Sequence, residues 1–140
     1  MRNIEVLIQS IEVFAPVDDN WEALDELIEE ICALKDERAI TPLLGLLERY
    51  PEQDGYGVFW GIIHGLEAIG GYESKLITSA LRKPYEFSVL MLNRIINSGT
   101  KKIDGRSVLD ILKEIANNSS FSESIREDAN EFISYQQETM

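Results

Sequence analysis

Apolar residues recur every three to four positions along most of this 140-residue chain, which is the spacing of amphipathic helices. The most regular run covers residues 19–34, and its apolar stripe consists of Trp21, Leu24, Leu27, Ile28, Ile31 and Leu34. Asp18, Asp19 and Asn20 can cap this helix, because each side chain can accept a hydrogen bond from a free amide of the first turn. A helix over residues 3–14 is predicted before it, and Pro16 lies in the break.

Residues 33–71 predict two further helices joined by a polar turn. Asp36 can cap the first of them, Pro42 lies near its start, and Pro51 ends it. The second helix, over residues 56–70, has three faces when its positions are spaced at about 100° per residue. Its apolar face consists of Phe59, Ile62, Ile63, Leu66 and Ile69, and small residues lie nearly opposite at Gly57, Gly61, Gly65 and Ala68. Between these two faces runs a third stripe of Tyr56, Trp60, His64 and Glu67.

The remaining residues predict helices over 72–82 and 85–98, one that contains Val108 and Ile115, and a last one over 122–137. Pro84 suits the first turn of the second of these helices. Asp104 can cap the third, and Ser120 with Glu123 resembles a capping box for the last. No stretch alternates with period two over a useful length, so we predict an all-α chain of about eight antiparallel helices.

The central pair opens with LKDERAITPLL at residues 34–44 and closes with LEAIGG at residues 66–71. These segments resemble the HEAT-repeat family, in which Asp-x-Arg-Ala-hydrophobic-x-Pro-x-Leu opens a first helix and Ala-Leu-x-x-hydrophobic-Gly closes the second. The family's usual Arg early in the second helix is absent, and Val58-Phe59-Trp60 stands there instead. The resemblance implies one domain over residues 1–140 that forms a short α-solenoid, a HEAT-like superhelix. In a right-handed stack of this kind, the helices near 19–34, 56–70, 85–98 and 122–137 share one layer.

The net charge is −12, and the acidic residues are concentrated at the two ends of the chain. Residues 1–54 hold 14 acidic and 4 basic residues, whereas residues 55–121 hold 6 acidic and 8 basic ones. Such a surface repels phosphate backbones and acidic lipids and attracts basic partners. We therefore expect a basic protein partner, and neither nucleic acid nor membrane.

The helix over residues 19–34 presents its acids on the side opposite its apolar stripe, at Glu22, Asp25, Glu26, Glu29 and Glu30. A charged helix face usually serves only solubility, so a solvated face is the default interpretation and a protein-binding face is the alternative. These acids stand on one helix without histidine or a calcium-loop glycine pattern, so no metal site is predicted.

Catalytic chemistry has few candidates in this sequence. His64 is the only histidine, so it would have to serve alone in a zinc site or a catalytic triad. The glycines at 55, 57, 70 and 71 lack the Lys and Ser/Thr of a phosphate-binding loop. We predict no enzyme activity and no cofactor, and we favour helix packing over a partner groove for the small-residue row.

The chain has one cysteine, Cys32, and it begins without the continuous apolar core of a signal peptide. We expect a cytoplasmic protein with a buried structural thiol.

These features together favour a non-catalytic binding module. A small, acidic, HEAT-like chain of this kind resembles the immunity proteins of bacterial toxin systems, which neutralise a cognate toxin, such as a nuclease, by direct binding. The predicted binding residues are Asp18, Asp19, Glu22, Glu26, Glu29, Asp54, Tyr56, Trp60, His64 and Glu67. A HEAT-like scaffold or regulatory adaptor, or an accessory enzyme like the chromophore lyases, is the alternative.

Overall fold

The computed structural model describes residues 2–51 and 55–139, and these residues form an all-α fold, as predicted. Its α-helices are α1 (Ile4–Glu12), α2 (Glu22–Ala33), α3 (Ile40–Arg49), α4 (Phe59–Ile69), α5 (Glu73–Arg82), α6 (Glu86–Asn97), α7 (Val108–Ala116) and α8 (Glu123–Glu138). Short 3-10 helices, η1 (Glu37–Ala39) and η2 (Gly55–Gly57), precede α3 and α4. The contacts divide the chain into two compact units, unit 1 (residues 1–72) and unit 2 (residues 73–140).

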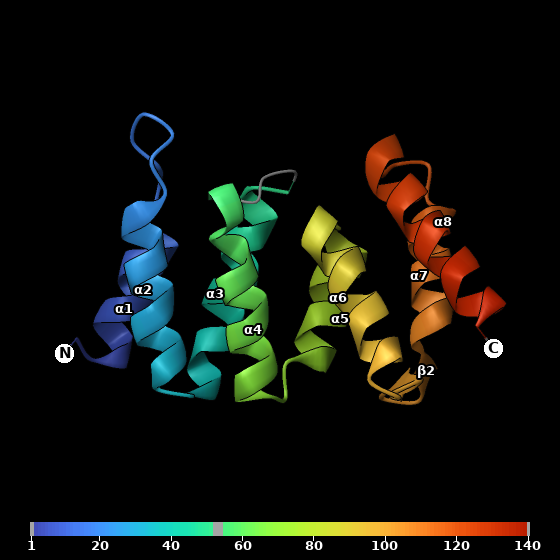
Figure 1. Ribbon diagram of the computed structural model, residues 1–140, viewed down its shortest axis with the longest axis horizontal. Coiled ribbons are helices and arrows are strands. Elements are labelled where there is room, and N and C mark those ends of the chain that lie inside the picture. The colour runs from blue at the N-terminus through green and yellow to red at the C-terminus, as the bar shows by residue number, and fades with distance from the viewer. Residues whose placement is uncertain (1, 52–54, 140) are drawn as a thin grey trace. The chain divides into compact units, whose positions relative to one another are not determined.

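Unit 1 is built from two helix pairs. Helix α1 packs on α2, and α3 packs on α4. Alternate helices also contact each other, α1 with α3 and α2 with α4, and Figure 1 shows α2 and α4 side by side. The predicted apolar stripes supply the core, and its fully buried members include Leu7, Ile11, Leu24, Ile31, Leu43, Ile62 and Leu66. Helices 19–34 and 56–70 therefore share a side within this unit, as the repeat pattern predicts.

Four aromatic side chains close one end of unit 1. The Trp21 ring lies edge-on to Tyr50 and to Phe59, with centroid distances of 5.0 and 5.4 Å. Phe14 adds a third contact, with its centroid 5.8 Å from that of Trp21. Edge-to-face contacts of this kind stabilise a core beyond the area they bury. The cluster fixes the ends of the segments that lead into α2 and α4.

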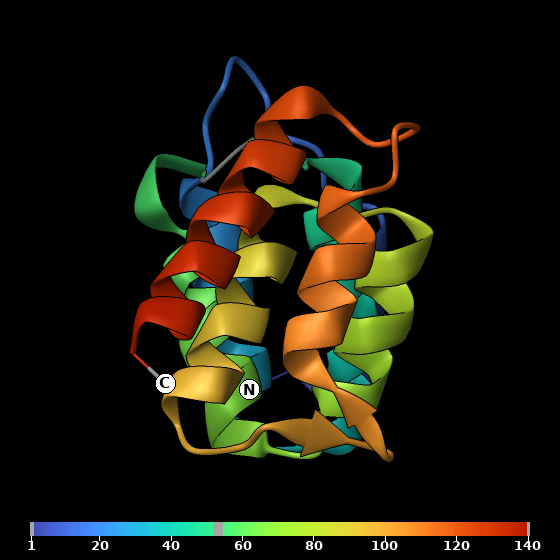
Figure 2. The ribbon, with the colours of Figure 1, turned by 90° about the vertical axis from the view of Figure 1, so that its right-hand side faces the viewer.

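Unit 2 repeats the same arrangement of pairs. Helix α5 packs on α6 and α7 packs on α8, while α5 also contacts α7 and α6 also contacts α8. Figure 2 shows α6 running beside α8, with a small hairpin at the start of α7. Val89, Met91, Leu92, Ile111, Leu112 and Ile115 are fully buried in this unit.

The hairpin corrects one prediction, because Asp104 does not cap α7. Strands β1 (Lys102–Ile103) and β2 (Arg106–Ser107) pair antiparallel around the dipeptide Asp104-Gly105. Both residues of that dipeptide have positive φ, 51° and 79°, as a two-residue type I′ loop requires. Ser107 is the cap of α7, since its side chain accepts from the amide of Asp110. Strands of two residues are too short to give an alternating pattern, so the sequence did not reveal them.

Two other predicted helix starts were also wrong. Ser122, not Ser120, caps α8, because Ser120 Oγ donates to Asn118 Oδ1 at 2.6 Å. Tyr85 is the cap residue of α6, so Pro84 lies before the helix and not in its first turn.

The start of α2 differs from the prediction as well. Asp18 and Asp19 have φ of 51° and 59° and form the tight turn that joins Val17 to Asn20. Of the three candidate caps, Asn20 accepts a hydrogen bond from the entering helix, from the Glu22 amide at 3.0 Å. The helix therefore begins at Glu22, and the two aspartates belong to the loop before it.

Candidate partner-binding surface

The acidic side of α2 is a solvent-facing stripe. Glu22, Asp25, Glu26 and Glu29 are all exposed along it. Glu30 lies at its edge and is half-buried, and its carboxylate pairs with the Arg2 guanidinium. Hydrogen bonding to Arg2 holds the pKa of Glu30 below its ordinary value. The four exposed acids therefore remain the part of this stripe that is most open to a partner.

The predicted third stripe of α4 is exposed in part. The Trp60 side chain is 39% exposed, which is unusual for so large an apolar group. His64 lies one turn further on and is exposed, and the two ring centroids are 6.1 Å apart with their planes tilted by 40°. Glu67 continues the stripe but is half-buried. An aromatic pair with polar edges thus faces the solvent on α4.

Helices α2 and α4 come close together because two glycines of α4 face α2. A Cβ atom added at Gly61 would lie 3.5 Å from Ile28 Cγ2, and one added at Gly65 would lie 2.1 Å from Cys32 Sγ. The predicted role of the small-residue row in helix packing is confirmed for these two positions. Gly57 has no atom within 4 Å of such a Cβ, and Ala68 is exposed, so neither belongs to the contact. We name the exposed acids of α2 together with Trp60 and His64 of α4 the acidic-aromatic surface.

A hollow of about 480 Å³ lies at one end of this surface, where the turn before α2 meets the start of α4. It is lined by Asp18, Asp19, Asn20, Trp21, Glu22, Gly55 and Val58. Asp19 Oδ1 accepts a hydrogen bond from Trp21 Nε1 at 3.2 Å, so this carboxylate also holds the turn onto the aromatic cluster. Asp19 therefore stabilises the turn before α2, in addition to any contact with a partner.

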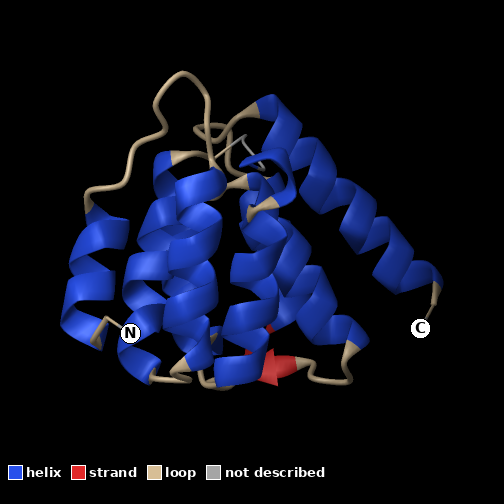
Figure 3. Cartoon of the chain, turned by 60° about the vertical axis from the view of Figure 1, so that its left-hand side comes forward, coloured by secondary structure: helices blue, strands red, loops and turns tan. Residues whose placement is uncertain are grey.

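The sequence did not single out the apolar residues of the neighbouring loop. Figures 1 and 3 show that the loop between α1 and α2 projects beyond the ends of those helices. Val13 and Val17 on this loop are 76% and 73% exposed. The sequence feature that could have indicated this loop is Pro16 beside the Asp18-Asp19-Asn20 turn. A proline and a tight turn together indicate an ordered, projecting loop.

Not every predicted binding residue can be placed. Asp54 lies outside the described residues. Tyr56 is described through its backbone in η2, and its side chain is outside the described part. The structure brings together the exposed acids of α2, the turn at Asp18 and Asp19, and the Trp60–His64 pair.

Three further observations bear on the chemistry of the chain. Within residues 2–51 and 55–139, no group of three His, Cys, Asp or Glu side chains is arranged to hold a metal ion. In the same ranges, no helix has both the length and the apolar character that crossing a bilayer requires. Burial raises the pKa of the Cys32 thiol to about 11, which disfavours the reactive thiolate.

Comparison of the chain with models of known protein families, with curated proteins and with solved structures finds no match. The function has to be inferred from the geometry and charge of the chain itself.

Proposed function

We propose that this chain is a non-catalytic binding module that holds a basic protein on the acidic-aromatic surface of unit 1. In its most specific form, the chain is an immunity protein and the partner is a toxin domain with a basic surface, such as a nuclease. The observation that carries the proposal is the packing of α2 on α4, which sets a row of exposed carboxylates beside an exposed tryptophan.

The two halves of the surface would contribute in different ways. Carboxylates that remain exposed to water add little to the affinity of the complex, but they steer an oppositely charged partner into encounter. An aromatic side chain that loses its contact with water on binding can supply a large share of the affinity. The exposed part of Trp60 and the adjoining His64 ring provide such a contact next to the acids.

We also propose that the helices form a short HEAT-like solenoid. Two facts support this architecture: each unit consists of two helix pairs, and alternate helices contact each other in both units. The resemblance of residues 34–44 and 66–71 to a HEAT repeat agrees with it. In such an array the layer containing α2 and α4 would present one continuous face to a partner.

Affinity capture from the source organism tests the proposed binding, with three forms of the purified chain as bait. The first is the wild type, and the second replaces the α2 acids Glu22, Glu26 and Glu29 by Lys. The third is a matched control that replaces the exposed α8 acids Glu123, Glu127 and Glu131 by Lys, and thus changes the net charge equally. We expect the wild type and the α8 variant to retain the same basic protein and the α2 variant to lose it.

Two results would contradict the proposed surface. Full retention by both variants would show that the α2 acids are not needed, and equal loss by both would show that total charge alone explains binding. The immunity function needs a second result, namely that the captured protein is toxic to cells and that the wild-type chain protects them. A captured protein without toxicity would favour the scaffold or adaptor function instead. A large toxin gene immediately upstream of the gene for this chain would favour immunity before any protein is purified.

A further inference from the structure

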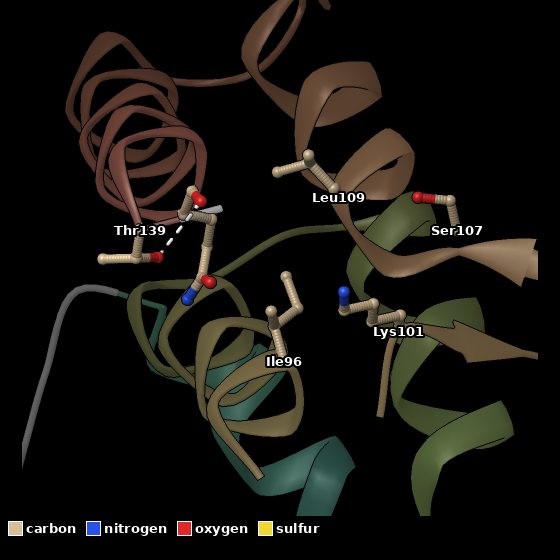
Figure 4. Close-up of a pocket in the computed structure, with 6 residues that line it drawn as sticks. Ile96, Lys101, Ser107, Leu109 and Thr139 are labelled. Carbon is tan, nitrogen blue, oxygen red and sulfur yellow. Dashed lines mark hydrogen bonds between the residues drawn. The ribbon is translucent and has the colours of Figure 1, made fainter. Parts of the chain in front are cut away.

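Unit 2 contains a cavity of about 210 Å³ that has no part in the proposed protein-binding surface. It is lined by Ile96, Lys101, Ser107, Leu109, Gln136 and Thr139. Figure 4 shows the side chains of Ile96, Lys101 and Leu109 reaching into one space, with Thr139 on the other side. These residues come from the end of α6, the segment before β1, the start of α7 and the end of α8.

One wall of the cavity is formed by Gln136, which belongs to an amide cluster with Asn93 and Asn97. Gln136 is only 6% exposed, and its Nε2 donates to Asn93 Oδ1 at 2.7 Å and to Asn97 Oδ1 at 2.8 Å. Both amide hydrogens of Gln136 are thereby committed, so what this side chain offers to the cavity is its Oε1 acceptor. An amide oxygen at a cavity wall can accept a hydrogen bond from a ligand that enters the cavity.

The opposite end of the cavity carries donors. The Lys101 ammonium is a full positive charge with three hydrogens to donate. Ser107 caps α7, and its Oγ accepts from the Asp110 amide at 3.2 Å, which leaves its hydroxyl hydrogen available. Between the two ends, Ile96 and Leu109 are half-buried and apolar. The cavity therefore has a positive end, an apolar middle and an accepting wall.

We propose that this cavity binds a small hydroxy monocarboxylate. The carboxylate would accept hydrogen bonds from Lys101 and Ser107, the short carbon chain would lie between Ile96 and Leu109, and the hydroxyl would donate to Gln136 Oε1. A volume of about 210 Å³ is smaller than the sites of drug-sized ligands, so a ligand of about four carbons fits it. A phosphate is a poorer match, because one lysine and no arginine line the cavity, and phosphate sites favour several cations or the planar arginine fork.

The ligand probes are 2- and 3-hydroxybutyrate, with the neutral amide of each as its counterpart. Binding is followed by the amide NMR signals of the full-length, 15N-labelled chain. We expect the acids to cause saturable shifts at Ile96, Ser107 and Leu109, and we expect the neutral amides to cause none. The signals of α2 and α4 should stay in place, because those helices belong to unit 1.

Three variants locate the site. Lys101→Gln removes the proposed carboxylate partner and should weaken binding about tenfold or more, the size expected for losing a charged hydrogen bond. Lys102→Gln is the matched control, because it removes the same charge from the next residue, which does not line the cavity, and it should change affinity less than about twofold. Leu109→Phe should block binding by filling the apolar middle.

Several results would overturn the proposal. The first is the absence of saturable shifts at the cavity residues for either acid up to about 50 mM, far above a millimolar dissociation constant. The second is equal weakening in Lys101→Gln and Lys102→Gln, which would indicate attraction to the basic loop and not a site. If Leu109→Phe does not fold, the affinities of Lys101→Gln and Lys102→Gln, both at exposed lysines, still test whether the ligand binds in the cavity.

Discussion

Gly65 and Cys32 lie so close that a Cβ atom at position 65 would be 2.1 Å from the cysteine Sγ and 3.0 Å from its Cβ. This contact sets the distance between α4 and α2, and thereby brings Trp60 and His64 beside the acidic stripe. Gly61, one turn earlier on α4, has a looser contact of 3.5 Å with Ile28. The two glycines therefore provide a matched test of the helix contact.

Gly65→Ala should destabilise the chain, and Gly61→Ala should not. The added methyl group at position 65 has no room, and overpacking of this kind costs about 1 to 3 kcal/mol. At position 61 the methyl group makes ordinary contact, and alanine in a helix interior is favoured over glycine by about 1 kcal/mol. Urea denaturation of both variants measures the difference.

Removing the Cys32 thiol should reduce the destabilisation caused by Gly65→Ala. In the Cys32→Ala background, Gly65→Ala should cost less than in the wild type, because the sulfur atom that the methyl group meets is gone. Equal costs in the two backgrounds would show that α2 and α4 do not meet at this pair.

Leu66→Ala should cost about 2 to 5 kcal/mol in the free energy of unfolding, since Leu66 is 0% exposed and its truncation leaves a cavity. Glu67→Ala, at the next residue, should cost much less because Glu67 is half-buried and lies on the stripe of Trp60 and His64, away from the apolar face. Thermal or urea unfolding compares the two directly. Equal midpoints would mean that the faces of α4 are assigned wrongly.

Cys32 should react slowly while the chain is folded. Burial raises the pKa of its thiol to about 11, against about 8.5 for a free cysteine, so the thiolate fraction at pH 8 falls roughly 200-fold. Iodoacetamide labelling, followed by mass spectrometry at increasing pH, should accelerate only as the pH nears 11. The same labelling in urea is the control and should be fast at pH 8.

The same shift predicts a pH dependence of stability. The folded-state pKa of Cys32 is raised, so its contribution is fully present below the unfolded-state pKa of about 8.5 and is lost as the pH rises through about 11. The melting temperature of the wild type should therefore fall more over this window than that of Cys32→Ala. Cys32 is half-buried, and parallel curves for the two proteins would mean that this burial does not raise the pKa of its thiol.

The helices could be predicted from the sequence because most of them carry a clear apolar stripe. Leu24, Ile31, Ile62 and Leu66 were assigned to inner faces by spacing alone, and all four are fully buried. The close contact of α2 with α4 was also foreseeable, because a glycine every fourth residue leaves one side of a helix bare.

The helix starts were harder to predict, because several neighbouring residues can cap and only one does. Asp104 has the chemistry of a cap, but the following glycine makes a two-residue hairpin loop available, and Ser107 takes the cap position. Asp18 and Asp19 likewise form a turn while Asn20 accepts from the helix. The side chains near each helix start allow several different caps, and the packing around each loop determines which of them forms.

The cavity in unit 2 could not be found from the sequence at all. Its amide wall joins Gln136 to Asn93 and Asn97, which are about 40 residues away in the chain, with separations of 43 and 39. Polar residues on otherwise apolar helix faces give no hint of which partner they will meet. Only the packing of α6 on α8 brings these amides together.

The proposed function predicts that the acids and the tryptophan act on different rates. The variant with Glu22, Glu26 and Glu29 replaced by Lys should mainly slow association with the basic partner, by about tenfold or more at low salt. Trp60→Ala should mainly speed dissociation, by about 30-fold, the effect of losing about 2 kcal/mol from an anchor. Asp19 is left unchanged because it accepts from Trp21 Nε1 and has a positive φ, so a lysine there would disturb the turn.

The most direct test of the proposed binding surface is the association rate of the captured basic partner, measured as a function of ionic strength for the wild type, the α2 variant and the α8 variant. We predict a steep fall of the rate with salt for the wild type and the α8 variant, and a nearly flat dependence for the α2 variant. A folded α2 variant with the wild-type rate and salt slope would show that the acidic stripe of α2 is only a solvated face.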